Sequence, residues 1–322
     1  MNTPLPDFTL SRPQSVQEAV AQKLTAPAGR YLAGGTDLIV NMRRGLVETD
    51  LLIDLTGIDE LAALSASKAG LTIGAGVTLA ELAAHPSLNN YPAIVQAAAA
   101  VAGPGHRAAA TLGGNLCLDT RCLYYNQSEW WRRSNDYCLK YRGEICHVAP
   151  TGDKCRAAFC GDLAPALLVH DAEVEIAGPD GRRRLPLAEL YRDDGAAHLT
   201  LTPEELLVAV HLPADLRRSA YEKIRVRGAI DFPLAGVALA IIDGERPARL
   251  KVAVTGTDSR PLLIAGLDDL DASQLGEAEL ARIDKAVQKE VSPLRTTMVA
   301  GHYRRLAAAR LARRLAARLG VD

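Results

Sequence analysis

Four of the six cysteines in this chain lie close together in the sequence and could act as one chemical group. They are Cys122, Cys138, Cys146 and Cys155, all within residues 119–156. Four thiolates on one segment are the donor set that a structural zinc ion or a [4Fe–4S] cluster requires. The same segment holds both tryptophans and four of the nine tyrosines, so aromatic rings would shield a bound centre from water.

The spacing of these cysteines does not decide what they bind. The intervening stretches of 15, 7 and 8 residues contain no Cys-x-x-Cys pair, which zinc ribbons usually use, and they also differ from the common ferredoxin pattern. Four unconnected reduced cysteines are a further interpretation, while disulfides are rare in the cytosol. His147 is either an ordinary loop histidine or an alternative ligand. The cations able to balance an anionic cluster are Arg132, Arg133, Lys140 and Arg142.

Two glycine-containing segments could bind a phosphate group through their backbone. Gly34-Gly35-Thr36-Asp37 and Gly113-Gly114-Asn115 are each expected where a strand ends. Glycine lacks a Cβ and tolerates positive φ, so backbone N–H groups can approach a pyrophosphate closely. Thr36 and Asn115 add side-chain donors, and a helix expected after Gly35 would present free N–H groups. Neither segment is G-x-G-x-x-G, so a Rossmann crevice is not indicated, and each pair alone is also consistent with a tight turn.

Hydrophobic patterns predict the elements that position these residues. Ser15 is expected to cap a helix over residues 15–24, and Thr78 with Glu81 forms a capping-box pattern before a second helix. The other elements expected before residue 213 are strands at 30–33, 51–55, 71–74 and 206–212, a helix at 90–101, a helix or buried strand at 164–169, and a hairpin of 173–176 with 183–186.

A polar, proline-containing linker at residues 213–218 is the expected domain boundary, which gives domains 1–216 and 217–322. Beyond it we expect an antiparallel sheet and two amphipathic helices, the last at 300–319. Because strands and helices are segregated there, the class is α+β. The last helix should carry a solvated or, alternatively, partner-docking stripe of Arg304, Arg305, Arg310, Arg313, Arg314 and Arg318.

Composition narrows the class of protein. A net charge of −1 and a pI near 6.7 give no reason to expect binding to nucleic acid or to a charged membrane surface. The sequence has no apolar run long enough to span a bilayer, and its first residues do not resemble a signal peptide. We therefore expect a cytoplasmic protein.

The order of several motifs resembles a known family. Those motifs include Leu32-Ala33-Gly34-Gly35-Thr36-Asp37-Leu38, Ala110-Thr111-Leu112-Gly113-Gly114-Asn115-Leu116, Gly161-Asp162-Leu163-Ala164-Pro165, Lys223-x-x-x-Arg227 and Asp231-Phe232-Pro233. The chain resembles the flavin-binding medium subunits of the xanthine dehydrogenase and carbon monoxide dehydrogenase family over nearly its whole length outside residues 119–156. In that family the segment after Gly-Gly-Asn runs almost directly into Asp-Leu, so residues 119–156 are an insertion. Cys117 and Cys160, at its ends, are expected to be buried small hydrophobes.

The resemblance implies a two-lobed FAD-binding domain of the vanillyl-alcohol-oxidase type, followed by a small α/β domain. Asp162 would contact ribityl or ribose hydroxyls, although a helix N-cap is its ordinary role. Lys223 would lie at the flavin or adenine end, although an exposed edge-strand cation is the alternative. The implied cofactor-binding residues are Leu32, Ala33, Gly34, Gly35, Thr36, Asp37, Leu38, Ala102, Thr111, Gly114, Asn115, Asp162, Leu207 and Lys223.

The resemblance also implies an electron-transfer function. Residues 119–127 are similar to one branch of the family, the 4-hydroxybenzoyl-CoA reductases, and a redox role favours a [4Fe–4S] cluster in the insertion. The implied partners are a molybdopterin-binding large subunit, a [2Fe–2S] small subunit and ferredoxin as electron donor. One alternative is a molybdenum hydroxylase subunit with a structural zinc, which passes electrons out to NAD or a quinone. Another is a flavin-less scaffold that holds partners through its arginine-rich helix.

Overall fold

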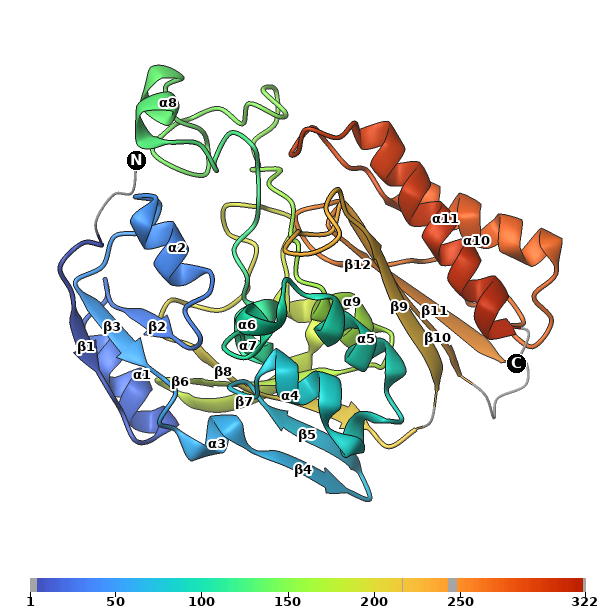
Figure 1. The fold of residues 1–322 in the computed structure, drawn as a ribbon, viewed down its shortest axis with the longest axis horizontal. Coiled ribbons are helices and arrows are strands. Elements are labelled where there is room, and N and C mark those ends of the chain that lie inside the picture. Colours follow the sequence, from blue (N-terminus) through green and yellow to red (C-terminus); the bar gives the residue numbers. More distant parts are fainter. Residues whose placement is uncertain (1–4, 216, 243–247, 321–322) are drawn as a thin grey trace.

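The computed structural model describes residues 5–215, 217–242 and 248–320, and the strands in this part of the chain form three sheets (Figure 1). The first sheet is parallel, with the order β1-β3-β2 and the bounds β1 (Thr9–Ser11), β2 (Arg30–Leu32) and β3 (Leu51–Asp54). Helix α1 (Val16–Thr25) connects β1 to β2, and α2 (Leu38–Arg43) follows β2. The expected cap of α1 is confirmed, since the Ser15 hydroxyl accepts from the Glu18 N–H at 3.1 Å.

The second sheet is antiparallel and has the order β4-β5-β8-β6-β7. Its strands are β4 (Leu64–Ser67), β5 (Gly70–Gly74), β6 (Glu173–Gly178), β7 (Gly181–Pro186) and β8 (Leu206–Pro213). The expected hairpin of β6 and β7 is confirmed. Between β5 and β6 the chain forms the helices that cover this sheet, together with the insertion.

These helices are short, and several begin as the sequence predicts. Thr78 caps α4 through the predicted capping box, in which the Glu81 carboxylate accepts from the Thr78 N–H at 2.8 Å. Residues 163–168 form a helix rather than a buried strand. The helices and 3₁₀ turns up to residue 190 are α3 (Asp59–Ala62), α4 (Leu79–Ala84), η1 (Pro86–Leu88), α5 (Pro92–Ala100), α6 (Pro104–Arg107), α7 (Leu112–Leu116), α8 (Glu129–Ser134), α9 (Leu163–Leu168) and η2 (Leu187–Leu190).

The third sheet confirms the antiparallel arrangement expected near the C-terminus. Its order is β12-β11-β10-β9, with the bounds β9 (Arg218–Ile224), β10 (Ala235–Ile242), β11 (Arg249–Thr255) and β12 (Leu262–Leu263). Helices α10 (Glu277–Glu290) and α11 (Gly301–Gly320) cover one face (Figure 1). Every residue of β10 is buried, because its other face packs against α5 and α9.

The side chains of β10 alternate between two cores. Val237, Leu239 and Ile241 pack with the C-terminal helices, whereas Ala238 and Ala240 belong to the core of the preceding region. The proposed boundary at residue 216 lies between β8 and β9, and the packing is continuous across it, so the division into domains 1–216 and 217–322 stays a prediction.

The helical pattern predicts a solvated position for Arg304 in the last helix, and this is wrong because Arg304 is fully buried. Its guanidinium donates to the carbonyls of Leu234 at 3.0 Å and Leu294 at 2.9 Å, and also to Gly256. The helix period places this arginine on the inner face of α11. There it donates to carbonyls of loop residues, because backbone carbonyls in the interior need a hydrogen-bond donor. No helix in the described ranges has the length and apolar character that crossing a bilayer requires.

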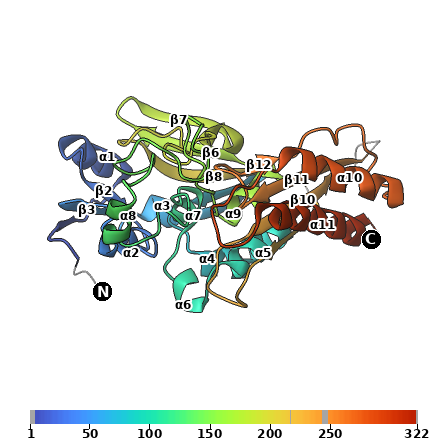
Figure 2. The same cartoon turned by 90° about the horizontal axis from the view of Figure 1, so that it is seen from above.

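The insertion projects above α2, at the end of the molecule where α11 begins (Figures 1 and 2). Arg121 and Ala158 form its neck, with paired backbone hydrogen bonds of 2.7 Å in both directions. Beyond this neck the insertion is irregular except for α8, whose first turn is capped by Ser128. It also touches the C-terminal part of the chain, since the Leu123 N–H donates to the Thr296 carbonyl at 2.8 Å.

Candidate functional site

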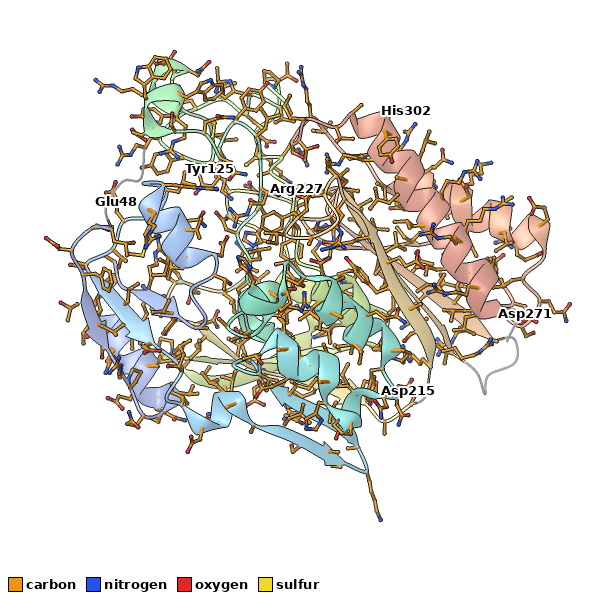
Figure 3. The ribbon with its side chains drawn as sticks, viewed as in Figure 1. Glu48, Tyr125, Asp215, Arg227, Asp271 and His302 are labelled. Carbon is orange, nitrogen blue, oxygen red and sulfur yellow. The ribbon has the colours of Figure 1, made fainter. Side chains whose placement is uncertain are left out.

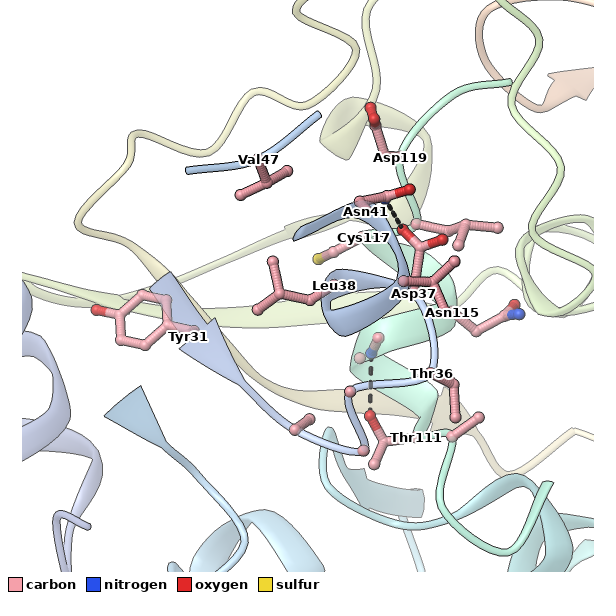
Figure 4. A pocket seen from close by; sticks show the side chains of 18 of the residues that line it. Tyr31, Thr36, Asp37, Leu38, Asn41, Val47, Thr111, Asn115, Cys117 and Asp119 are labelled. Carbon is pink, nitrogen blue, oxygen red and sulfur yellow. Dashed lines mark hydrogen bonds between the residues drawn. The ribbon is translucent and has the colours of Figure 1, made fainter. Parts of the chain in front are cut away.

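A pocket of about 1210 Å³ lies between the N-terminal parallel sheet, the second sheet and the insertion. Its floor is made by the turn between β2 and α2 and by the start of α7 (Figure 4). Figure 3 labels Glu48, Tyr125 and Arg227 on its walls, which come from the loop after α2, the insertion and the loop after β9. The predicted cofactor residues that line it are Ala33, Gly34, Gly35, Thr36, Asp37, Leu38, Ala102, Thr111, Gly114, Asn115, Asp162 and Leu207.

The two glycine segments meet backbone to backbone in this pocket. A Cβ on Gly34 would lie 1.8 Å from the Ala109 carbonyl oxygen, so no side chain fits there. Gly35 has a φ of 67°, which lets the chain turn from β2 into α2. Glycine is therefore required at both positions for the turn and for the close contact.

The second glycine pair is not at a strand end as predicted, because Gly113 and Gly114 lie inside the short helix α7. Thr111 caps this helix, and its hydroxyl accepts from the Gly114 N–H at 3.1 Å (Figure 4). The Asn115 side chain accepts from the Leu163 N–H at 3.0 Å and so ties α7 to α9. The preceding N–H groups of this turn donate as well, Leu112 to the Val77 carbonyl at 2.9 Å and Gly113 to the Ala75 carbonyl at 2.8 Å, so α7 is tied to the second sheet through its backbone.

Asp162 and Lys223 form a buried ion pair of 2.9 Å beside the pocket. The Tyr221 hydroxyl also donates to Asp162, at 2.6 Å. The alternative roles hold only in part: Asp162 occupies the N-cap position of α9 but its side chain makes no cap hydrogen bond, and Lys223 lies on the edge strand β9 but only 3% of its side chain is exposed. Burial raises the pKa of Asp162, and the Lys223 ammonium opposes that shift.

Two of the predicted cofactor residues do not line the pocket. Lys223 reaches it through two lining residues, the Asp162 carboxylate at 2.9 Å and the Asp231 carbonyl at 3.3 Å, and Leu32 lies behind the turn that follows it. Leu32 ends β2, where successive side chains point to opposite faces, so its neighbour Ala33 faces the pocket instead.

Sequence reasoning missed a polar cluster at the neck of the insertion. The Arg121 guanidinium pairs with Asp37, and its plane lies 5.1 Å from the centre of the Phe232 ring. Asn41 donates to the same Asp37 carboxylate at 3.0 Å (Figure 4). Asp37 and Asn41 are neighbours on one helical turn, but Arg121 lies 80 positions beyond Asn41 and Phe232 lies farther still, so no local pattern could have indicated the cluster. Asp37 is thereby held in place rather than left free for a ligand.

The four cysteines of the insertion line one small cavity of about 10 Å³. All six cysteines are free, so the disulfide interpretation receives no support. In the described ranges no three His, Cys, Asp or Glu side chains stand close enough together to hold a single metal ion. The other residues around this cavity are Tyr124, Tyr125, Leu139, Lys140, His147, Val148 and Ala157.

Burial sets the protonation of these thiols. It raises the pKa of Cys122, and it raises the pKa of Cys155 to about 12. Both thiols are therefore protonated at neutral pH, and binding of a metal centre would have to displace their protons. Cys117 and Cys160 lie away from this cavity and line the large pocket instead; Cys160 is buried as expected, whereas Cys117 is only half-buried.

Comparison with known proteins gives the following similarities. Residues 6–215 match the FAD binding domain in molybdopterin dehydrogenase. The chain is 34% identical over 274 residues to the aldehyde oxidoreductase FAD-binding subunit PaoB of Escherichia coli K12, covering 81% of this chain and 85% of that one. It is 27% identical to the carbon monoxide dehydrogenase medium chain of Hydrogenophaga pseudoflava, covering 78% of this chain and 75% of that one.

Two solved structures share the fold. Quinoline 2-oxidoreductase from Pseudomonas putida 86 superposes with a TM-score of 0.78 at 20% identity, and carbon monoxide dehydrogenase from Oligotropha carboxidovorans with 0.80 at 22% identity. Each superposition covers 99% of both chains. The expected fold, with its FAD-binding region and a C-terminal antiparallel sheet with helices, is thereby confirmed.

Proposed function

Because this chain belongs to the family of FAD-binding domains of molybdopterin dehydrogenases, we propose that it carries electrons between FAD and a second redox centre within a larger oxidoreductase. The large pocket would hold FAD, and the cavity of four cysteines would hold a [4Fe–4S] cluster. The observation that carries the proposal is that both cavities share wall residues, so the two centres would be neighbours.

The large pocket fits a dinucleotide in size and chemistry. The turn at residues 34–36 presents backbone N–H groups at the floor of the pocket, beside the start of α7, which suits a pyrophosphate. FAD supplies the ability to exchange two electrons with one partner and single electrons with another. The protein would hold the pyrophosphate at Gly34 to Thr36 and at Gly114. The Asp162–Lys223 pair would place two buried opposite charges beside the cofactor.

The donor set of the cysteine cavity supports a cluster, although at about 10 Å³ the cavity has room for only one water, so the four thiols would have to move apart to enclose the cluster. A single zinc draws four sulfurs to about 2.3 Å from one point, and no such compact group exists in the described part of the chain. In a [4Fe–4S] cluster each thiolate binds a different iron, so its four cysteines stand farther apart around a larger body. Tyr124 and His147 stack at 5.2 Å against this cavity, and such rings would exclude water from the cluster.

The partners we propose are a molybdopterin-binding large subunit and a [2Fe–2S] small subunit. The similarity to carbon monoxide dehydrogenase medium chains supports this assembly, since a medium chain implies larger and smaller companions. In the reductive version of the proposal, the complex is a 4-hydroxybenzoyl-CoA reductase. Electrons then enter from ferredoxin, pass through this chain and reach the molybdenum site, where the aromatic hydroxyl is removed.

In a second candidate function, electrons flow through this chain in the opposite direction. The relative at 34% identity is an aldehyde oxidoreductase subunit, which favours oxidation of an aldehyde and export of electrons through FAD. The two candidates differ in which compound exchanges electrons with the flavin of the assembled complex. Bleaching of the flavin by an aldehyde under anaerobic conditions would support the second candidate. Reoxidation of the reduced flavin by 4-hydroxybenzoyl-CoA would support the first.

Cofactor content tests the central proposal. The anaerobically purified protein should contain one FAD, about four irons and about four acid-labile sulfides per chain. Cys122→Ala should lose most of the iron and keep FAD, whereas Cys117→Ala, five positions earlier and outside the cysteine cavity, should keep its iron. One zinc without labile sulfide would contradict the cluster. A colourless chain after incubation with FAD would favour a flavin-less scaffold.

A further inference from the structure

The wall between the two cavities contains one buried cation. In the described part of the chain, only Tyr125 and Lys140 line both the large pocket and the cysteine cavity. The side chain of Lys140 is 6% exposed, and its ammonium lies 4.8 Å from the centre of the Tyr125 ring. A positive charge is thus enclosed next to four thiol groups.

The contacts of Lys140 fix its ammonium at the neck of the insertion. It donates to Asp119 Oδ1 at 2.6 Å, to the Gly195 carbonyl at 2.8 Å and to Thr120. Asp119 lines the large pocket but not the cysteine cavity, and its side chain is 31% exposed. Lys140 therefore lines both cavities, whereas its counter-charge Asp119 lines only the large pocket.

The other cations of the insertion do not share this position. The Arg132 guanidinium donates to the Gly45 carbonyl at 3.2 Å and to the Glu129 carboxylate at 2.6 Å. Arg142 pairs with Glu48 at 3.4 Å and is half exposed. Neither lines the cysteine cavity, and neither does Arg133. Of the four cations expected to balance a cluster, the structure brings only Lys140 to it.

We propose that Lys140 raises the reduction potential of the cluster held in the cysteine cavity, and so sets how readily electrons cross the wall between the two centres. This inference rests on the proposed function. Reduction by one electron adds one negative charge to the cluster, and a nearby cation stabilises the reduced form more than the oxidised form. The effect is large only because the ammonium is buried, where charges interact more strongly than in water.

Removal of the charge tests this role. The midpoint potential of the cluster would be measured by titration with dithionite and electron paramagnetic resonance, after iron, sulfide and FAD have been assayed. In Lys140→Met the ratio of reduced to oxidised cluster at a fixed potential should fall about tenfold, which is ~59 mV for a one-electron couple. Lys140→Arg should keep most of the potential. Lys154→Met is the matched control, since Lys154 is an exposed cation of the same insertion, and its potential should not change.

A second variant keeps the test decisive if Lys140→Met does not fold. Asp119→Asn removes the counter-charge and leaves the ammonium, so it should move the potential upward, opposite to Lys140→Met. Full iron content with equal potentials in wild type, Lys140→Met and Lys154→Met would overturn the inference alone. A downward shift in Asp119→Asn would also overturn it. If the wild-type chain holds no iron or sulfide, the proposed cluster fails, and this inference fails with it.

Discussion

The glycine turns of the large pocket meet each other through their backbones, whereas the cysteine cavity beside it is lined by side chains from an irregular segment. Gly34 contacts the Ala109 carbonyl, and Thr111 caps the helix that contains Gly114. In the insertion, all of which the structure describes, the only helix is α8, and the four cysteines come from separate stretches outside it. The first site depends on regular elements of the scaffold, and the second depends on irregular chain that single hydrogen bonds, such as those to Gly45 and Gly195, tie to the scaffold.

This difference has a consequence for stability. The scaffold buries continuous apolar cores on both faces of its sheets. A destabilising substitution there should therefore lower the free energy of global unfolding. The apolar cluster that holds the insertion is small: it contains Tyr125 and two of the cysteines from the insertion, with Leu46 and Ala157 from outside it. We therefore expect the insertion to open locally at lower free energy than the scaffold unfolds. The following predictions test that contrast.

The largest effect is expected at the buried ion pair of the scaffold. Asp162→Asn leaves the Lys223 ammonium buried without a counter-charge, which should cost about 3–5 kcal/mol of unfolding free energy. Urea denaturation of the isolated chain measures this loss. Asp269→Asn is the control, because its pair with Arg282 is exposed and its loss should leave the unfolding free energy almost unchanged. Similar losses in both variants would contradict the assignment.

A side chain at Gly34 should be nearly as damaging. Gly34→Val forces a Cβ onto the Ala109 carbonyl, and neither backbone can move cheaply, so we expect a loss of about 3 kcal/mol of unfolding free energy. The variant should also lose the FAD that otherwise stays bound through gel filtration. Gly105→Ala is the control, because a Cβ at that position would have no atom within 4 Å and alanine suits the helix. Normal FAD content in Gly34→Val would refute the predicted role of this turn.

Acid should weaken the scaffold through its buried histidines. Burial lowers the pKa of His170 and of His198 from 6.5 to about 4, so the unfolded chain binds more protons between these values. Stability should therefore fall as pH falls from 6.5 to 4, by up to about 1.4 kcal/mol per pH unit for each histidine. Denaturation at several pH values gives the slope. His170→Gln should flatten it, and an unchanged slope in that variant would show that other groups control acid unfolding.

The smallest effects are expected from the loss of a helix cap, one in the scaffold and one in the insertion. Thr78→Ala removes the capping box of α4 and should lower global stability by about 1 kcal/mol. Ser128→Ala removes the cap of α8 in the insertion and should leave global stability almost unchanged while amide exchange in α8 speeds up. Equal global losses would mean that the insertion unfolds together with the scaffold.

Local sequence patterns predicted most of the scaffold. The capping box at Thr78, the hairpin of β6 and β7, and the strands of the C-terminal sheet all follow from rules that act over a few residues. The prediction of a strand end at Gly113 was wrong, because this residue lies in the short helix α7. Five helical residues are too few to show a helical period in the sequence. It also failed at Arg304, because a charged residue on a helix is usually exposed.

The sequence by itself determined the kind of chemistry, through the glycine turns and the four grouped cysteines, because residue type and order are local properties. Only the tertiary structure decided which side chains share a site. It brought Arg121 to Asp37, joined Lys223 to Asp162, and placed Lys140 between the two cavities. Such contacts join residues far apart in the chain, and they form because a buried charge must find a partner once the surrounding apolar groups have packed.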